Sequence, residues 1–324
     1  MSASRRHVVR ALISLVLLAL LVLYARSVNW PTAWSVMRSA SLSLLLFSAL
    51  ANLVTVGAKA IVWWIFLRGV GAPSLGLSLR ATISGAALNN LVIANGGDAA
   101  RAVLVARGSD ASGAAVLAAL TLERLFDFIG YTLVVAIAAF LLPMPPSVAR
   151  WRGLAVLVLL AIVALLWFLM VRVAEAPVAP ESRPTTLLAR ARAFFARYAH
   201  KLSGMVTLPR LAAAFALTLV NWGSQIASYH WAAMATHFPI TIAGSIAAMI
   251  TSNVGFLMRL TPGNVGVFQF VYALTAQALG LSRDAAVGTA LLLQIVQNVP
   301  VVLLGSAVSP ALVLRRDAVT ETQL

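Results

Sequence analysis

Six long apolar runs constrain this chain more than any other feature of its sequence. They cover roughly residues 8–25, 42–67, 113–142, 153–173, 211–236 and 285–311. A helix needs about 20 apolar residues to cross a bilayer, whereas the strands of a membrane barrel are shorter and alternate apolar with polar residues. The chain is 61% hydrophobic and only 10% charged, while soluble domains carry about 25% charged residues. The sequence therefore predicts an all-α polytopic membrane protein.

Two further apolar regions are interrupted near their middle. Residues 77–107 contain Asn89, Asn90, Asn95, Gly96, Gly97 and Asp98, and residues 240–281 contain Asn253, Arg259, Pro262, Gly263, Asn264 and Gly266. Each region is too long for one span. Non-helical backbone at membrane depth is tolerated only inside protein or beside a water-filled cavity. Each region is therefore predicted to be a re-entrant hairpin, giving six full spans plus two hairpins.

The order of these elements predicts an inverted repeat within a single integral membrane domain, residues 1–324. Two spans, a hairpin and one span occupy about 8–142, and the same series, starting from the opposite side of the membrane, occupies about 153–311. Inverted repeats are common in transporters. The stretch 119–123 after the first hairpin resembles 290–294 after the second. Chance similarity between helices rich in Ala and Leu stays open as the alternative.

The net charge of +15 is spread over the segments between apolar runs. That pattern is typical of positive-inside loops and argues against a nucleic-acid partner. It predicts that both termini and the segment 174–210 face the cytoplasm. Within that segment, residues 184–202 have one apolar sector flanked by basic residues, which favours an interfacial helix on anionic lipid over a solvated loop.

Other chemistry has little support in the sequence. There is no cysteine, and His230 and His237 have no third ligand nearby, so we expect no metal site. Neither a P-loop nor a nucleophile elbow is present, so we expect no cofactor and no catalytic residue. The expected partners are membrane lipids, with a homo-oligomer or enzymes of lipid synthesis left open.

Charged side chains inside the apolar regions are the main candidates for function, because each costs about 2.5–3.5 kcal/mol at the bilayer centre. Asp98 and Arg101 follow the Gly96-Gly97 turn, where a helix start would favour the acid and could bind a phosphate. The third span carries Glu123, Arg124 and Asp127. A transport role and a buried ion-pair network that locks the helices together are both open for these groups.

The second hairpin and the second span add further candidates. Arg259 precedes a helix break that contains Pro262, Gly263 and Gly266. Uncharged polar groups after that break are Gln269, Gln294, Gln297 and Asn298, which either face a cavity or bond between helices. Asn90, in the first interrupted region, is a further candidate. Lys59 lies about ten residues from either end of its span, which is too deep to snorkel easily, so we expect it in a cavity.

These motifs, in this order, resemble the lysylphosphatidylglycerol synthase transmembrane-region family over about residues 8–312. Its members include the flippase half of the multiple peptide resistance factor. The chain ends at Leu324, so the soluble synthase domain of that protein is not expected here. The resemblance implies lipid translocation. The chain departs from the family pattern at Asp98, where a Glu is usual, and at Asn264 and Gln269, which replace a Gly and an acid.

We therefore expect a lipid flippase of the bacterial inner membrane, which moves an anionic or phosphate-bearing lipid between leaflets. Lys59, Arg101, Arg124 and Arg259 would receive the headgroup where the two hairpins meet. Two alternatives stay open: a lipid or polyprenyl-phosphate glycosyltransferase, and a non-catalytic scaffold of a lipid-synthesis complex.

Overall fold

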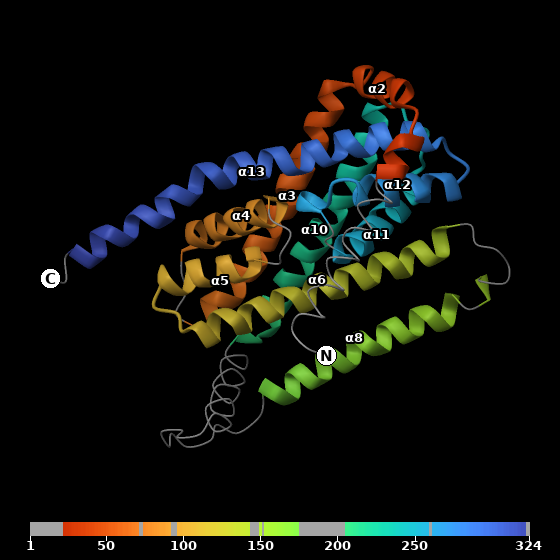
Figure 1. The fold of residues 1–324 in the computed structure, drawn as a ribbon. Helices are drawn as coiled ribbons and strands as arrows, with labels where there is room; N and C mark the ends of the chain where they lie inside the picture. Colours follow the sequence, from red (N-terminus) through yellow and green to blue (C-terminus); the bar gives the residue numbers. More distant parts are fainter. Residues whose placement is uncertain are drawn as a thin grey trace, which may run out of the picture. The chain divides into compact units, whose positions relative to one another are not determined.

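In the computed structural model, most of the described residues form helices (Figure 1). It describes residues 22–70, 74–91, 96–142, 149–150, 152–174, 205–258 and 261–321. Within those ranges there is no strand. The helices are α2 (Trp30–Arg38), α3 (Leu42–Leu67), η1 (Arg68–Val70), α4 (Leu75–Leu91), α5 (Gly96–Arg107), α6 (Gly113–Leu141), α8 (Arg152–Ala174), α10 (Leu208–Ala235), α11 (Ile242–Met258), η2 (Pro262–Asn264), α12 (Val267–Ala278) and α13 (Arg283–Glu321).

Three of the predicted spans are confirmed as helices long and apolar enough to cross a membrane. They are Leu42–Leu67, Gly113–Leu141 and Arg283–Val308. The predicted runs 153–173 and 211–236 also fold as helices, α8 and α10, and that they cross the membrane stays a prediction. Most of the run 8–25 and the whole interfacial helix 184–202 lie outside the described residues.

Both interrupted regions form antiparallel helical pairs. In the first, a Cβ added at Gly108 would lie 3.0 Å from Leu77, and one at Gly85 would lie 2.6 Å from the carbonyl oxygen of Gly97. In the second, the Phe256 and Phe268 rings are 5.6 Å apart, and α11 and α12 run side by side (Figure 1). The hairpin prediction is confirmed as regards helical structure, while re-entry into the membrane stays a prediction.

Gly263 and Gly266 account for the break in the second hairpin. Their φ angles are 59° and 89°, and Asn264 between them has a φ of 57°. This left-handed conformation is disfavoured for residues with a Cβ and cannot continue an α-helix. The chain therefore turns through η2 and starts again as α12.

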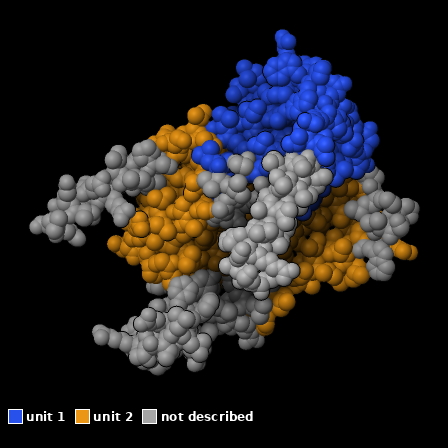
Figure 2. All heavy atoms as spheres, viewed as in Figure 1, with its two compact units in different colours: residues 1–52, 89–95, 225–300 blue, residues 53–88, 96–224, 301–324 orange. Residues whose placement is uncertain are grey.

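The chain divides into two compact units, each built from separated segments (Figure 2). Unit 1 comprises residues 1–52, 89–95 and 225–300, and unit 2 comprises 53–88, 96–224 and 301–324. The core of unit 1 is aromatic, with Tyr229, Phe268 and Tyr272 almost fully buried and their ring centroids 6.2–6.4 Å apart.

Unit 2 has its own core, which surrounds the polar groups described below. Trp63, Phe66, Leu122 and Phe126 are buried in it, and α8 lies along α6 (Figure 1). The other face of α8 exposes a row of large apolar side chains, including Leu157 at 65%. Such a face is unfavourable in water and is typical of contact with lipid. The division into two repeats at 8–142 and 153–311 stays a prediction.

Candidate functional site

A buried ion pair in unit 2 joins α5 to α6. The Arg101 Nη2 donates to Glu123 Oε2 at 2.5 Å, and the two side chains are only 4% and 2% exposed. The Arg101 guanidinium also lies over the Trp63 ring, 5.0 Å from its centroid. In an apolar interior, neither charge is tolerated without the other. The pair therefore fixes α5 against α6.

A second, more exposed pair lies beside it. The Arg124 Nη2 donates to Asp98 Oδ2 at 2.5 Å, with the side chains 45% and 35% exposed. Asp98 is also 3.3 Å from Arg101 Nε. Because Asp98 lies in the first turn of α5, the helix dipole stabilises its negative charge. Arg124 is thus the arginine of this network that a ligand can reach.

Asp127 is the third acid of the network, one turn along α6 from Glu123. Its carboxylate lies 3.1 Å from Lys59 Nζ of α3 and accepts a hydrogen bond from Asn221 Nδ2 of α10 at 3.2 Å. The Trp222 Nε1 donates to the Asp127 carbonyl oxygen at 3.2 Å. Arg124 Nη1 lies 3.7 Å from the same carboxylate. Asp127 thereby joins three helices.

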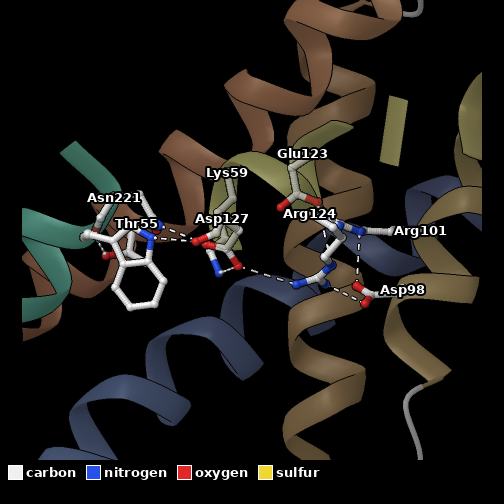
Figure 3. A network of polar contacts seen from close by, with 9 residues as sticks. Thr55, Lys59, Asp98, Arg101, Glu123, Arg124, Asp127 and Asn221 are labelled. Atoms are coloured by element: carbon white, nitrogen blue, oxygen red, sulfur yellow. Dashed lines mark hydrogen bonds and ion pairs between the residues drawn. The ribbon is translucent and has the colours of Figure 1, made fainter. Parts of the chain in front are cut away.

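These six side chains form one continuous network, which Figure 3 shows from close by. Three acids and three bases give a formal sum of zero, which lowers the free-energy cost of placing them among apolar helices. The six residues are Lys59, Asp98, Arg101, Glu123, Arg124 and Asp127. All of them were predicted as site residues, and the structure brings them together. That any of them binds a substrate stays a prediction.

The predicted polar residues of unit 1 form a separate, uncharged cluster. Gln269 accepts from the Gly266 N–H at 2.6 Å and donates to Gln294 Oε1 at 2.5 Å, and Gln294 donates to the Gly263 carbonyl at 2.7 Å. Gln269 and Gln294 are almost fully buried. A Cβ added at Gly263 would lie 2.9 Å from the Asn90 carbonyl oxygen and 3.9 Å from Asn298 Nδ2. The amide side chains therefore form hydrogen bonds with the backbone N–H and carbonyl groups that the helix break leaves without helical partners.

The remaining predicted residues are placed as follows. Gly96 and Gly97 begin α5, and Pro262 begins η2. Arg259 lies outside the described residues. Gln297 bonds through its backbone carbonyl to Asn52 Nδ2.

Sequence reasoning missed Asn221, which was not singled out although it is a polar residue within the apolar run 211–236. It is 3% exposed, and its backbone carbonyl accepts from Thr55 Oγ1 at 3.2 Å. An amide in the middle of an apolar helix was the available signal. Its partner Asp127 lies 94 residues away in sequence, so no local pattern could have identified the pairing.

Comparison with known families gives one match: the lysylphosphatidylglycerol synthase TM region matches residues 8–305. The chain belongs to this family. A search among curated proteins gave no match.

Family membership agrees with the three helices able to cross a membrane, and together they identify a multi-helix membrane protein with a lipid-related role. The match spans both the charged network of unit 2 and the amide cluster of unit 1. Among the described residues, no group of three or more His, Cys, Asp or Glu side chains is placed to bind a metal ion.

Proposed function

We propose that this protein moves an anionic, phosphate-bearing lipid between the leaflets of the bacterial inner membrane, and that it does so without catalysing a reaction. One observation carries the proposal. The Arg124 side chain is 45% exposed within a network whose neighbouring cation, Arg101, is 4% exposed. The network thus contains one accessible arginine, paired with Asp98 and close to Asp127.

Arg124 suits a phosphate because a guanidinium can donate two parallel hydrogen bonds to its oxygens. In the free protein the Asp98 carboxylate occupies that position. A phosphate headgroup would replace Asp98 at Arg124, and Asp98 would stay paired with Arg101 Nε at 3.3 Å. At Arg124 one anion then replaces another, while the acyl chains remain in lipid.

The proposal also assigns roles to the other charges. Arg101 and Glu123 would set the position of α5 and α6 and would not touch the headgroup, because both are buried. Lys59, which is 30% exposed, would add a second positive charge close to the headgroup.

Both termini would face the cytoplasm. Fusions of a periplasm-active and a cytoplasm-active reporter to each end would test this orientation.

Reconstitution tests the proposal directly. The full chain is placed in liposomes with fluorescent phospholipids of several headgroups, and exchange between leaflets is followed by quenching from outside. We expect exchange faster than in empty liposomes, and at least about tenfold slower with Arg124→Gln. The matched control is Arg107→Gln. Arg107 is an exposed arginine at the end of α5, so this substitution removes the same charge outside the network.

Two results would overturn the proposal. Exchange no faster than in empty liposomes for every headgroup would remove transport altogether. Equal loss with Arg124→Gln and Arg107→Gln would show that only overall charge matters. If Asp98, Arg101 and Arg124 could all be replaced without a phenotype in the cell while the protein stays folded, a scaffold role would account for the data. A lipid product detected by mass spectrometry and lost with Asp127→Asn would favour a transferase.

A further inference from the structure

A small pocket opens beside the charged network of unit 2. Its lining residues come from three helices: Lys59 and Val62 of α3, Glu123 and Asp127 of α6, and Thr218 and Asn221 of α10. The space inside it that a water-sized occupant can fill is about 10 Å³, which is room for roughly one water or one small ion. Most of the polar atoms around it are oxygens.

Two side-chain oxygens of the lining residues lack a hydrogen-bond partner among the described residues. Glu123 is 2% exposed and uses Oε2 to accept from Arg101, while its Oε1 has no hydrogen-bond partner. Asn221 is 3% exposed and uses Nδ2 to donate to Asp127, while its Oδ1 has no partner. An unsatisfied buried acceptor is unfavourable. Both atoms therefore favour an occupant that is a donor or a cation.

A cation already lies at the edge of this pocket. The Lys59 ammonium is 3.1 Å from Asp127 Oδ2 (Figure 3). Its side chain is 30% exposed and sits on a flexible four-carbon stem, so the ammonium can withdraw without a change in the backbone. Withdrawal would leave the network one positive charge short, next to two carboxylates, an amide oxygen and the Thr218 hydroxyl.

We propose that this pocket binds a small monovalent cation, with Na⁺ as the probe, in exchange for the Lys59 ammonium. The oxygens of Glu123, Asp127 and Asn221 would be the ligands, since hard cations prefer carboxylate and carbonyl oxygen. One positive charge replaces another, so the sum of the network stays at zero. A divalent ion would leave it at +1, which is less favourable in an apolar unit.

The site has a direct connection to the proposed headgroup site and, in this respect, rests on the proposed function. Arg124 Nη1 lies 3.7 Å from Asp127 Oδ2, and Arg124 Nη2 bonds Asp98. The exchange leaves the charge beside Asp127 unchanged and releases the Lys59 ammonium, which the proposed function places close to the phosphate. Binding of the cation and of the lipid would then each strengthen the other, as linkage requires.

Cation binding can be measured on the purified full chain in detergent, without any lipid transport. Thermal unfolding is compared in choline chloride, NaCl, LiCl and KCl at equal ionic strength. We expect a saturable rise in Tm with Na⁺, of about 2–4 °C at ten times Kd. The decisive variant is Lys59→Met, because removal of the competing ammonium should lower the Kd for Na⁺ by about tenfold or more.

A second variant keeps the test independent of the buried ion pair. Asn221→Ala removes one oxygen ligand and leaves Arg101 and Glu123 paired, so the Na⁺-dependent rise in Tm should be lost. Ser224→Ala is the control, because Ser224 lies three residues further along α10 and does not line the pocket. It should bind Na⁺ as the wild type does.

The proposal is overturned if no cation shifts Tm in either the wild type or Lys59→Met. Equal shifts in the wild type and Asn221→Ala would also overturn it, since the cation would then bind without the Asn221 oxygen. Failure of the proposed function is separate: Na⁺ would bind, with tighter binding in Lys59→Met, but proteoliposomes would show no lipid exchange with or without Na⁺.

Discussion

The two helical hairpins of this protein are each bonded to the helix that follows them, but through different side-chain chemistry. Each pairs two antiparallel helices, with glycines at the start of α5 in the first hairpin and within the break in the second. In the α4–α5 hairpin, Arg101 of the returning helix bonds Glu123 of the following helix through a buried ion pair. In the α11–α12 hairpin, the corresponding contact is between the neutral amides of Gln269 and Gln294.

The difference indicates what each hairpin can do. A neutral amide pair can hold helices together and form hydrogen bonds with backbone groups at a helix break, but it presents no charge to a ligand. The ion pair holds helices together and also fixes Asp98 and Arg124, which are 35% and 45% exposed. Stability could be provided by either chemistry, so the charges in the first hairpin point to function. Four substitutions test this contrast, taken from the largest expected effect to the smallest.

Glu123→Gln should be the most destabilising. It removes the buried counter-ion of the Arg101 guanidinium and leaves only the partly exposed Asp98 beside it, and breaking a buried pair costs up to about 3–5 kcal/mol in free energy of unfolding. Unfolding of the purified protein in detergent, followed by circular dichroism, measures the loss. Replacing both partners, with Arg101→Met and Glu123→Leu, should recover part of it. A double variant as unstable as Glu123→Gln would contradict this account.

Gly85→Ala should come next, because α4 and α5 touch through their backbones. A Cβ at Gly85 would lie 2.6 Å from the Gly97 carbonyl oxygen, which cannot move without its helix. Overpacking of this kind costs about 1–3 kcal/mol. The matched control is Gly255→Ala in the other hairpin, where a Cβ would meet the Val271 side chain at 3.2 Å. Equal losses of Tm would show that the two helix contacts do not differ as described.

Gln269→Ala should have a moderate effect of about 1–2 kcal/mol on the free energy of unfolding. It leaves the Gly266 N–H and the Gln294 Oε1 without their partners, and both are neutral groups. The same unfolding measurement applies. A loss as large as that of Glu123→Gln would mean that charge is not what distinguishes the two hairpins.

Asp98→Asn should have the smallest effect on stability, about 0–1 kcal/mol, because the pair with Arg124 is partly exposed. Asp98→Asn should change the rate of lipid exchange clearly while it changes Tm little, since the proposed headgroup competes with the Asp98 carboxylate for Arg124. Parallel measurement of Tm and of leaflet exchange separates the two. If Tm falls sharply while the exchange rate is unchanged, Asp98 has a structural role only.

The sequence predicted the positions of the elements well, because apolar runs and helix breaks are local signals. The predicted run 42–67 coincides with α3, and α5 starts at Gly96, the first residue of the predicted glycine turn. The six charged residues were also identified, since charge within apolar sequence is conspicuous. That Lys59 lies at a pocket agrees with the prediction made from its depth in the span.

The pairing of those charges could not be read from the sequence. From the sequence, Arg101 could have paired with Asp98, Glu123 or Asp127. Only the rotation of α5 against α6 determines that Glu123 is its buried partner. Helix rotation depends on side-chain packing across the whole core, such as Trp63 beneath Arg101. Asn221 was missed for the same reason, because its role depends on α10 lying next to α6.

The close approach of Gly85 to Gly97 has a consequence for motion. Two helices in contact at their backbones, with no side chain between them, leave little room to slide or tilt past each other. In the transport cycle we propose, we therefore expect α4 and α5 to move together. Arg101 lies on α5 beside that contact and bonds Glu123 of α6, so it should not move independently of these helices. Any opening around the charged network is then expected at other helices.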